Sequence, residues 1–180
     1  MRLPDALTKP TADNTFCGTF GAQTWNDLAI WEEFFNRYPI ASLIELGTWK
    51  GGMAAFFAVQ GLSRGFQFTT LDNNGLWQEN REIVERLGGS CIVANVFDLD
   101  FMTKLIREHP KPLLLFCDNG DKRRELREIA SQLEKGDYVA VHDWGSESGP
   151  GDIPDAWSYL FQEECEAMQS LTRYFTFEPS

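Results

Sequence analysis

Apolar runs of four to six residues recur along this chain, and stretches with helical spacing separate them. The runs whose composition is typical of buried parallel strands are 41–46, 66–71, 91–94, 113–117 and 138–141. The stretches between them that favour helices are 51–60, 77–87, 100–108 and 122–133. Parallel strands connected through helices need right-handed crossovers. The pattern therefore predicts an α/β fold with a doubly wound, mostly parallel sheet and helices on both faces.

The two ends of the chain are less regular, and we expect a single domain over residues 1–180. Prolines and glycines break any periodicity in residues 1–22, which are predicted to form an arm or lid. Thr24 is a suitable N-cap for a helix with apolar residues at helical spacing, namely Leu28, Trp31, Phe34 and Phe35. Residues 154–168 are predicted to be a helix and 171–177 a last strand, which leaves a short C-terminal end.

The chain is acidic, because 27 Asp and Glu residues against 16 Lys and Arg residues give a formal net charge of −11. Such a surface repels phosphate backbones and anionic membranes, so nucleic acid and membranes are disfavoured partners. The one basic cluster, at 122–128, also contains two glutamates and is predicted to be a solvated helix face. Lys122 is accordingly expected to be exposed.

The cysteines and the lack of long apolar segments indicate in which cellular compartment the protein is expected. The four cysteines are far apart in the sequence and form no C-x-x-C pair; they are Cys17, Cys91, Cys117 and Cys165. Reduced thiols are therefore expected rather than a disulfide or a metal site. No segment approaches the roughly 18 apolar residues of a membrane span. We expect a soluble, cytoplasmic protein.

Every predicted strand ends in polar residues. These residues are, strand by strand, Glu45 with Gly47, Asp72, Asn95, Asp118, and His142 with Asp143. In open parallel sheets, ligands bind outside the carboxyl ends of the strands, near the point where the strand order reverses. Helix caps and turns explain any single one of these residues but explain the whole set less readily. The pattern indicates one polar crevice.

The turn after the first of these strands is the most informative segment. Gly47 and Gly51 allow a tight turn and a close approach of the backbone to a ligand, although such glycines also have a purely structural interpretation. Their G-x-x-x-G spacing differs from the G-x-G-x-x-G of dinucleotide folds. A nicotinamide-dependent oxidoreductase is therefore disfavoured.

With these residues in place, the chain resembles the class I S-adenosylmethionine (SAM)-dependent methyltransferases, which have a Rossmann-like fold. Their E-x-G-x-x-x-G motif matches Glu45, Gly47 and Gly51 and implies that this turn, with Thr48, contacts the methionine part of SAM. Their second motif, an acidic residue that ends the next strand, matches Asp72. A carboxylate there accepts hydrogen bonds from both ribose hydroxyls. The resemblance spans residues 43–144.

Two further positions follow from this resemblance. The residues after the third strand usually recognise the adenine, and here they are Asn95, Val96 and Phe97. Asp118, which ends the fourth strand, is also expected to contact the cofactor and is favoured for contact with the substrate.

Residues 116–122 and 133–144 narrow the resemblance to the branch of cephalosporin-hydroxylase-like and macrolide sugar O-methyltransferases. In that branch, acids after strands four and five hold a divalent metal that orients a pair of substrate hydroxyls. The resemblance thus implies Mg²⁺ ligands at Asp118 and Asp143. The chain departs from the branch in lacking a histidine shortly after Asp118 and in having His142 where an acid is common. Because Mg²⁺ prefers oxygen ligands, this departure weakens the case for a metal.

Three residues are candidates for the chemistry itself: Asp118, His142 and Asp143. His142 is either a general base or a hydrogen-bonded rim residue, since an unperturbed histidine pKa of about 6.5 suits a base near neutrality. Lys122 is an alternative base, but a lysine needs burial to lose its proton. Methyl transfer needs alignment and no protein nucleophile.

The sequence therefore predicts a SAM-dependent enzyme that methylates a hydroxyl of a small polar molecule, such as a sugar or a natural product. A non-catalytic module that binds SAM or S-adenosylhomocysteine (SAH) and acts through protein partners is the alternative. It is motivated by the C-terminal end, where family members usually have a helix and an antiparallel hairpin, and only one strand is predicted here. A second copy of the chain in a homodimer could then cover the open sheet edge.

Overall fold

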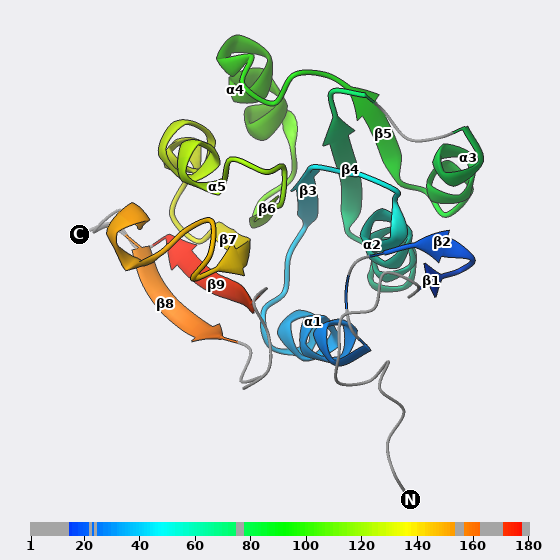
Figure 1. The fold of residues 1–180 in the computed structure, drawn as a ribbon, viewed down its shortest axis with the longest axis horizontal. Helices are drawn as coiled ribbons and strands as arrows, with labels where there is room; N and C mark the ends of the chain where they lie inside the picture. Colours follow the sequence, from blue (N-terminus) through cyan, green and yellow to red (C-terminus); the bar gives the residue numbers. More distant parts are fainter. Residues whose placement is uncertain are drawn as a thin grey trace, which may run out of the picture.

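The computed structural model describes residues 15–21, 23, 25–74, 78–153, 157–162 and 171–177. A seven-stranded sheet in the order β5-β4-β3-β6-β7-β9-β8 forms the centre of the fold (Figure 1). Neighbouring strands from β5 to β7 are parallel, whereas β9 runs antiparallel to both β7 and β8. The predicted doubly wound, mostly parallel sheet is confirmed.

The strands of this sheet are β3 (Ser42–Leu46), β4 (Gln67–Asp72), β5 (Ser90–Val93), β6 (Leu113–Cys117), β7 (Tyr138–Trp144), β8 (Trp157–Gln162) and β9 (Leu171–Phe177). The helices are α1 (Trp25–Arg37), α2 (Gly52–Arg64), α3 (Gln78–Arg86), α4 (Leu99–Glu108) and α5 (Lys122–Arg124). A wide helical turn at Glu125–Ile129 and a tight one at Ala130–Gln132 continue α5, so the helix predicted at 122–133 is helical but irregular. A short 3₁₀ turn, Pro150–Asp152, follows β7.

All five residues of β3 and of β6 are buried, as expected for central parallel strands. Successive side chains of a strand point to opposite faces of the sheet. Leu43 thus packs in a cluster with residues of α1, α2 and α3, whereas Ile44 packs with residues of α4 and of the turn after α5. Trp31 of α1 is fully buried, with its ring 4.8 Å from that of Phe57 and 5.1 Å from that of Phe116. The two clusters form the two sides of one α/β/α sandwich.

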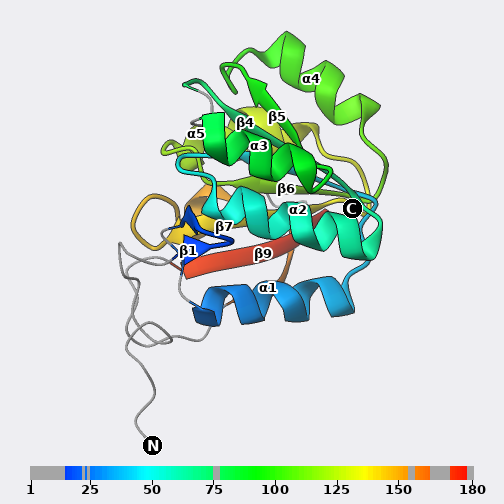
Figure 2. The same cartoon turned by 90° about the vertical axis from the view of Figure 1, so that its right-hand side faces the viewer.

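The N-terminal segment begins with a small hairpin of β1 (Thr15–Phe16) and β2 (Thr19–Phe20). Figure 2 shows this hairpin beside the beginning of α2. A Cβ atom on Gly52 would lie 2.5 Å from the Cα of Gly21, so the segment after the hairpin sits directly on the first turn of α2. Residues 1–14, residue 22 and the expected N-cap Thr24 lie outside the described residues, and the arm or lid stays a prediction.

The structure contradicts the prediction for the C-terminal end. Residues 157–162, expected within a helix over 154–168, form β8 and pair antiparallel with β9. Short apolar runs are ambiguous between strand and helix, and here pairing with a distant strand decides the outcome. The expectation of one final strand is wrong, because β8 and β9 form an antiparallel pair. Residues 154–156 and 163–170 lie outside the described residues.

Two smaller findings concern the other expectations. The described cysteines are free thiols: Cys117 is buried, Cys91 is half-buried and Cys17 is exposed, while Cys165 lies outside the described part of the chain. Among the helices that the structure describes, none has the length and apolar character needed to cross a membrane.

Candidate active site

The strand order reverses between β3 and β6, because the chain leaves β3 toward one face of the sheet and β6 toward the other. The turns after these two strands touch each other. A Cβ atom on Gly47 would lie 2.4 Å from the carbonyl oxygen of Asp118, and Gly47 has a φ of +93°. The structure thus gives Gly47 a packing role at the head of the crevice. Gly51, with a φ of +83°, lies just before α2.

A chain of buried hydrogen bonds supports the floor of the crevice. The Thr70 hydroxyl donates to Oε2 of Glu45 at 2.6 Å, and its oxygen lies 2.6 Å from the Thr48 hydroxyl oxygen. Glu45 is 1% exposed, and burial raises its pKa well above the usual range. Because two hydroxyls tie Glu45 to the turn, this carboxyl fixes the turn as well as lining the depression above it, together with Gly47 and Asp118.

Asp72 is brought directly to the same turn. Its Oδ2 accepts a hydrogen bond from the backbone N–H of Trp49 at 2.9 Å, and its Oδ1 accepts one from Asn74 at 2.9 Å. A carboxylate oxygen has more than one acceptor position, so each oxygen retains a position for a ligand hydroxyl. The arrangement is a fixed, half-exposed carboxylate.

Trp49 is a site residue that the sequence did not single out. Its φ is +46°, in the left-handed region that costs a non-glycine residue about 1 kcal/mol or more, and its side chain is 53% exposed. Such strain concentrates at functional sites. The only sequence signal is a tryptophan between two glycines.

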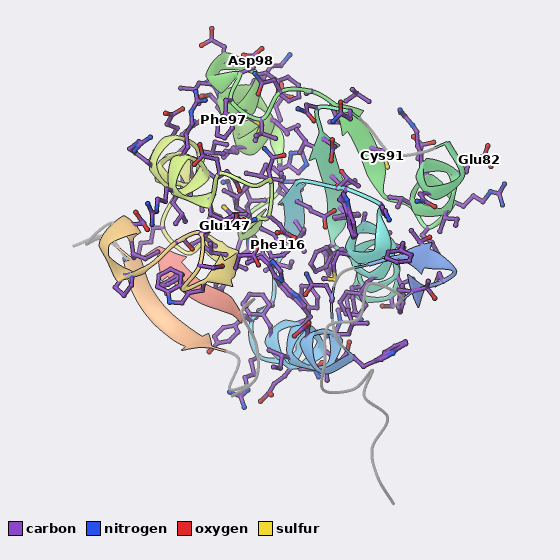
Figure 3. The ribbon with its side chains drawn as sticks, in the orientation of Figure 1. Glu82, Cys91, Phe97, Asp98, Phe116 and Glu147 are labelled. Carbon is purple, nitrogen blue, oxygen red and sulfur yellow. The ribbon has the colours of Figure 1, made fainter. Side chains whose placement is uncertain are left out.

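The three residues expected around an adenine differ in their placement. Asn95 is exposed, and its Oδ1 accepts a hydrogen bond from the backbone N–H of Phe97 at 3.0 Å. Val96 is 2% exposed and packs in the core. The Phe97 ring is half-buried, lies out toward α4 (Figure 3), and carries the guanidinium of Arg124 4.0 Å from its centroid. Asn95 and Phe97 are thus the residues with side chains near the surface.

The ends of β6 and β7 bring Asp118, His142 and Asp143 together. The Nδ1 atom of His142 lies 3.3 Å from Oδ1 of Asp118 and 3.2 Å from Oδ2 of Asp143. One candidate ligand atom from each of these residues lies within 4.8 Å of the others. Asp143 itself has a φ of +53°. The predicted catalytic residues therefore form one cluster.

Lys122 lies inside this cluster, which corrects the expectation that it is exposed. Its side chain is only 3% exposed, and its Nζ lies 3.3 Å from Asp118, 3.0 Å from Asp143 and 2.9 Å from Glu147. Glu125, expected on the same solvated face, is also fully buried and accepts the backbone N–H of Asp121 at 3.2 Å. The sequence of this charged stretch does not indicate that Lys122 and Glu125 point into the protein.

The carboxylates set the protonation of the two basic groups. Burial alone would lower the pKa of His142, but Asp118 and Asp143 outweigh it and raise this pKa to about 10. The pKa of Lys122 is raised above its usual range for the same reason, because its carboxylates outweigh burial. The pKa of Asp143 is held below its usual range by His142 and Lys122, against the effect of burial. Near neutral pH, both basic groups are cations.

Gln23, from the N-terminal segment, completes the surroundings of His142. Its side chain is buried, and its Nε2 lies 2.9 Å from Nε2 of the imidazole. Rotating the amide by 180° exchanges a donor for an acceptor at nearly the same position. Gln23 can therefore face either protonation state of Nε2. The sequence carries no signal for this contact, which joins residues 119 positions apart.

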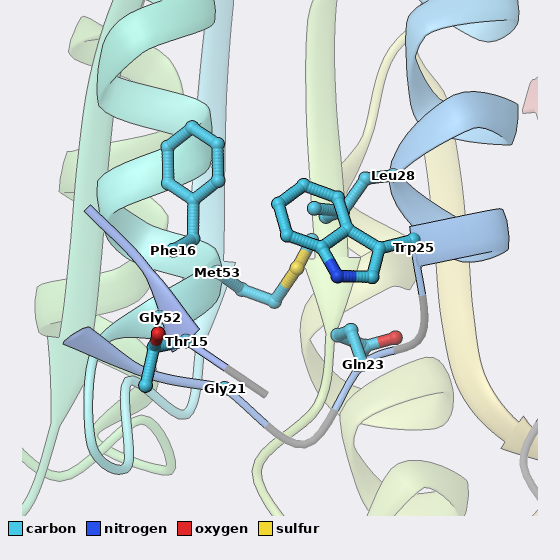
Figure 4. A pocket seen from close by; sticks show the side chains of 8 residues that line it. All are labelled: Thr15, Phe16, Gly21, Gln23, Trp25, Leu28, Gly52 and Met53. Atoms are coloured by element: carbon cyan, nitrogen blue, oxygen red, sulfur yellow. The ribbon is translucent and has the colours of Figure 1, made fainter. Parts of the chain in front are cut away.

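A small, narrow pocket adjoins the crevice, between the β1–β2 hairpin, α1 and α2 (Figure 4). Figure 4 shows Trp25, Leu28 and Met53 gathered on one side of it and Gln23 on another. Gln23 and Met53 also line the depression over Glu45 and Asp118. An apolar pocket is thus adjacent to the polar strand ends and shares lining residues with them.

A divalent cation does not fit this cluster as it stands. Both carboxylate oxygens that would bind it already contact the Lys122 ammonium. The Nδ1 atom of His142 faces the same two oxygens, so an ion between them would also have to displace this contact.

No protein-family model matches the sequence, and no curated protein matches it. Several solved structures are similar in fold. A CmcI structure with SAH has a TM-score of 0.64 at 16% identity, over 92% of this chain and 84% of that one. A CmcI structure with Mg and SAM has a TM-score of 0.58 at 18% identity, over 73% and 58%.

The O-methyltransferase from Bacillus cereus with SAH has a TM-score of 0.59 at 14% identity, over 86% of this chain and 82% of that one. This chain spans only 57% of the CmcI chain in its apo structure. At identities of 14–18%, the similarity shows a shared fold and nothing beyond it. The chain therefore has the Rossmann-like α/β fold that these SAM- and SAH-bound proteins share.

Proposed function

We propose that this chain is a SAM-dependent methyltransferase that methylates a hydroxyl group of a small molecule. The observation that carries the proposal is the pairing of Asp72 with the turn at 47–51 through the N–H of Trp49. This pairing places a fixed carboxylate with free acceptor positions beside the crevice where the strand order reverses. The similarity in fold to SAM- and SAH-bound structures supports the same cofactor.

The chain's residues fit SAM in three parts. Asp72 would accept the ribose hydroxyls, and the turn containing Gly47 and Thr48 would hold the methionine part beside Glu45 and Asp118. Asn95 and Phe97 would flank the adenine, with Val96 packed behind them. When bound, SAM supplies an electrophilic methyl group on a sulfonium.

His142 is the proposed general base. Its Nδ1–H faces Asp118 and Asp143, and its Nε2 faces Gln23 at the edge of the cavity. When Nε2 is unprotonated, it is the atom that takes the proton of an acceptor hydroxyl. Asp118 and Asp143 orient the ring and stabilise the imidazolium that results. With the pKa of His142 raised to about 10, we expect methyl transfer to quicken as the pH rises above neutrality.

The chemical character of the acceptor is inferred from the small pocket that Gln23 lines, since Gln23 also contacts His142. An acceptor with its hydroxyl near Gln23 would place a small neighbouring group against Trp25, Leu28 and Met53. This apolar lining favours a natural product with an aromatic or aliphatic part over a free sugar. An RNA methyltransferase from Salinibacter ruber has a TM-score of 0.55 to this chain at 15% identity. The net charge of −11 nonetheless disfavours a nucleic acid substrate.

The non-catalytic alternative loses its motivation, since β8 and β9 supply the C-terminal strand pair whose absence suggested it. A cytoplasmic location and a homodimer stay predictions.

Calorimetric titration with SAM and SAH tests the cofactor. We expect one site in the wild-type protein and at least about ten-fold weaker binding in Asp72→Asn. Asp100→Asn, at an exposed acid in the first turn of α4, is the matched control and is expected to bind as the wild type does. A folded wild-type protein that gives no heat with either ligand would overturn the proposal.

A further inference from the structure

The structure assigns to Lys122 the place of the divalent cation: we propose that its ammonium is a built-in cation between Asp118 and Asp143, and that the site works without a metal. The structural part of this inference does not depend on methyl transfer. Its consequence for catalysis rests on the proposed function.

The first support is saturation of the ammonium group. An ammonium has three N–H donors and no acceptor, and three carboxylates surround it within 3.3 Å. Asp118 comes from the end of β6, whereas Asp143 and Glu147 come from the end of β7 and the turn beyond it. Lys122 therefore joins two neighbouring strand ends, as a bound metal ion would.

The second support is that the same two oxygens serve both basic groups. Oδ1 of Asp118 and Oδ2 of Asp143 each contact both Lys122 Nζ and His142 Nδ1. A metal ion at these oxygens would have to displace an ammonium that is 3% exposed. The two carboxylates are thus already paired with two basic side chains.

The third support is the four-residue spacing between Asp118 and Lys122, which lets the lysine reach this carboxylate. Lys122 follows Asp118 by four residues across the turn into α5. This turn is held by Glu125, whose carboxylate accepts the N–H of Asp121, and by the side chain of Asp121, which accepts the N–H of Arg124. The loop geometry thus directs the lysine stem back toward the end of its own strand. Lys122 is a positioning residue, since it acts on the acceptor through the carboxylates and His142.

Mn²⁺ is a suitable probe, because its electron paramagnetic resonance signal falls when the free ion is bound. We expect EDTA-treated wild-type protein to bind no Mn²⁺ at millimolar concentration, with or without SAH. Lys122→Met removes the ammonium and leaves three facing carboxylates, which are ligands that divalent cations prefer. This variant is expected to bind Mn²⁺ at least about ten-fold more tightly than the wild type.

Lys111→Met is the matched control. Lys111 also pairs with a buried carboxylate, at 2.7 Å from Asp137, but belongs to the loop before β6, away from the crevice. It is expected to lose stability without gaining Mn²⁺ affinity. Should Lys122→Met fail to fold, the wild-type titration decides alone, since no binding supports the inference. Saturable binding of one Mn²⁺ by the wild type, lost in Asp143→Asn, overturns it.

A separate readout keeps the two proposals apart. SAH binding by calorimetry reports on the proposed function and does not depend on the Mn²⁺ result. If a methyl acceptor is found, wild-type turnover in EDTA is expected to match turnover with added Mg²⁺. A loss of turnover in EDTA that Mg²⁺ restores would overturn the inference while leaving methyl transfer established.

Discussion

At the scale of single residues, the site depends on charges that neutralise one another in a confined space. His142 is 7% exposed and contacts Asp118 after β6, Asp143 from its own strand and Gln23 from the N-terminal segment. Lys122 of α5 contacts the same two carboxylates. Breaking a buried ion pair leaves an uncompensated charge and costs far more than losing a surface pair. Asp143 adds a left-handed backbone, at a φ of +53°, that places its carboxylate between the two cations.

The pH dependence of stability tests the charge state of His142. Its pKa of about 10 in the fold exceeds the ordinary value of 6.5, so its contribution to the free energy of unfolding is complete below pH 6.5. That contribution is lost as the pH rises toward 10. We expect urea unfolding to show a decline over this interval in the wild type and a much smaller decline in His142→Gln.

Equal declines in the two proteins would contradict the contacts assigned to His142. Glu125 interferes little with this comparison. Burial raises its pKa to about 7, so its contribution is complete below 4.5 and is largely lost by pH 7, in the wild type and the variant alike.

At the scale of elements, the two turns after β3 and β6 hold the crevice together. The G-x-x-x-G spacing in the sequence indicated a tight turn but left open whether the glycines serve a ligand or the fold. For Gly47 the backbone of the facing turn gives the reason, since the Cα of Asn119 would lie 2.7 Å from an added Cβ. That neighbour lies on a different strand-to-helix turn, so no local pattern could have revealed it.

Gly47→Ala is therefore expected to separate these turns and to lower the free energy of unfolding by at least about 3 kcal/mol in urea titrations. Gly65→Ala is the matched control, because Gly65 has a φ of +83° but no atom within 4 Å of an added Cβ. Gly65→Ala is expected to lower the free energy of unfolding only by the cost of a left-handed backbone in a non-glycine residue, about 1 kcal/mol. Similar losses in both variants would show that φ alone, and not the contact with Asp118, makes glycine necessary at residue 47.

At the scale of the whole molecule, the antiparallel pair β8–β9 covers the edge of β7, the strand that ends in His142 and Asp143. Phe175 of β9 is 4% exposed, and its ring lies 5.5 Å from that of Trp144 at the end of β7. The C-terminal strands thus belong to the same core as the site.

Phe175→Ala is expected to lower the free energy of unfolding by about 3–5 kcal/mol, the usual cost of emptying a buried aromatic position. Leu62→Ala, on the solvent side of α2 and 67% exposed, should change it by less than about 0.5 kcal/mol. Chemical unfolding followed by circular dichroism measures both. A loss below about 1 kcal/mol in Phe175→Ala would mean that β8 and β9 are not part of the cooperative core.

The sequence by itself determined which segments of the chain form the parallel strands, which helices lie between them, and which polar residues end the strands. The strands and helices follow from the spacing of apolar residues, which is a local property of the sequence. The shared position of the polar residues follows because parallel strands end at one edge of the sheet. Only the tertiary structure decided that β8 is a strand, that Gln23 reaches His142 and that Lys122 turns inward. Each of these depends on partners that the chain brings together from far apart, and a charged residue is stable inside a protein only when such partners surround it.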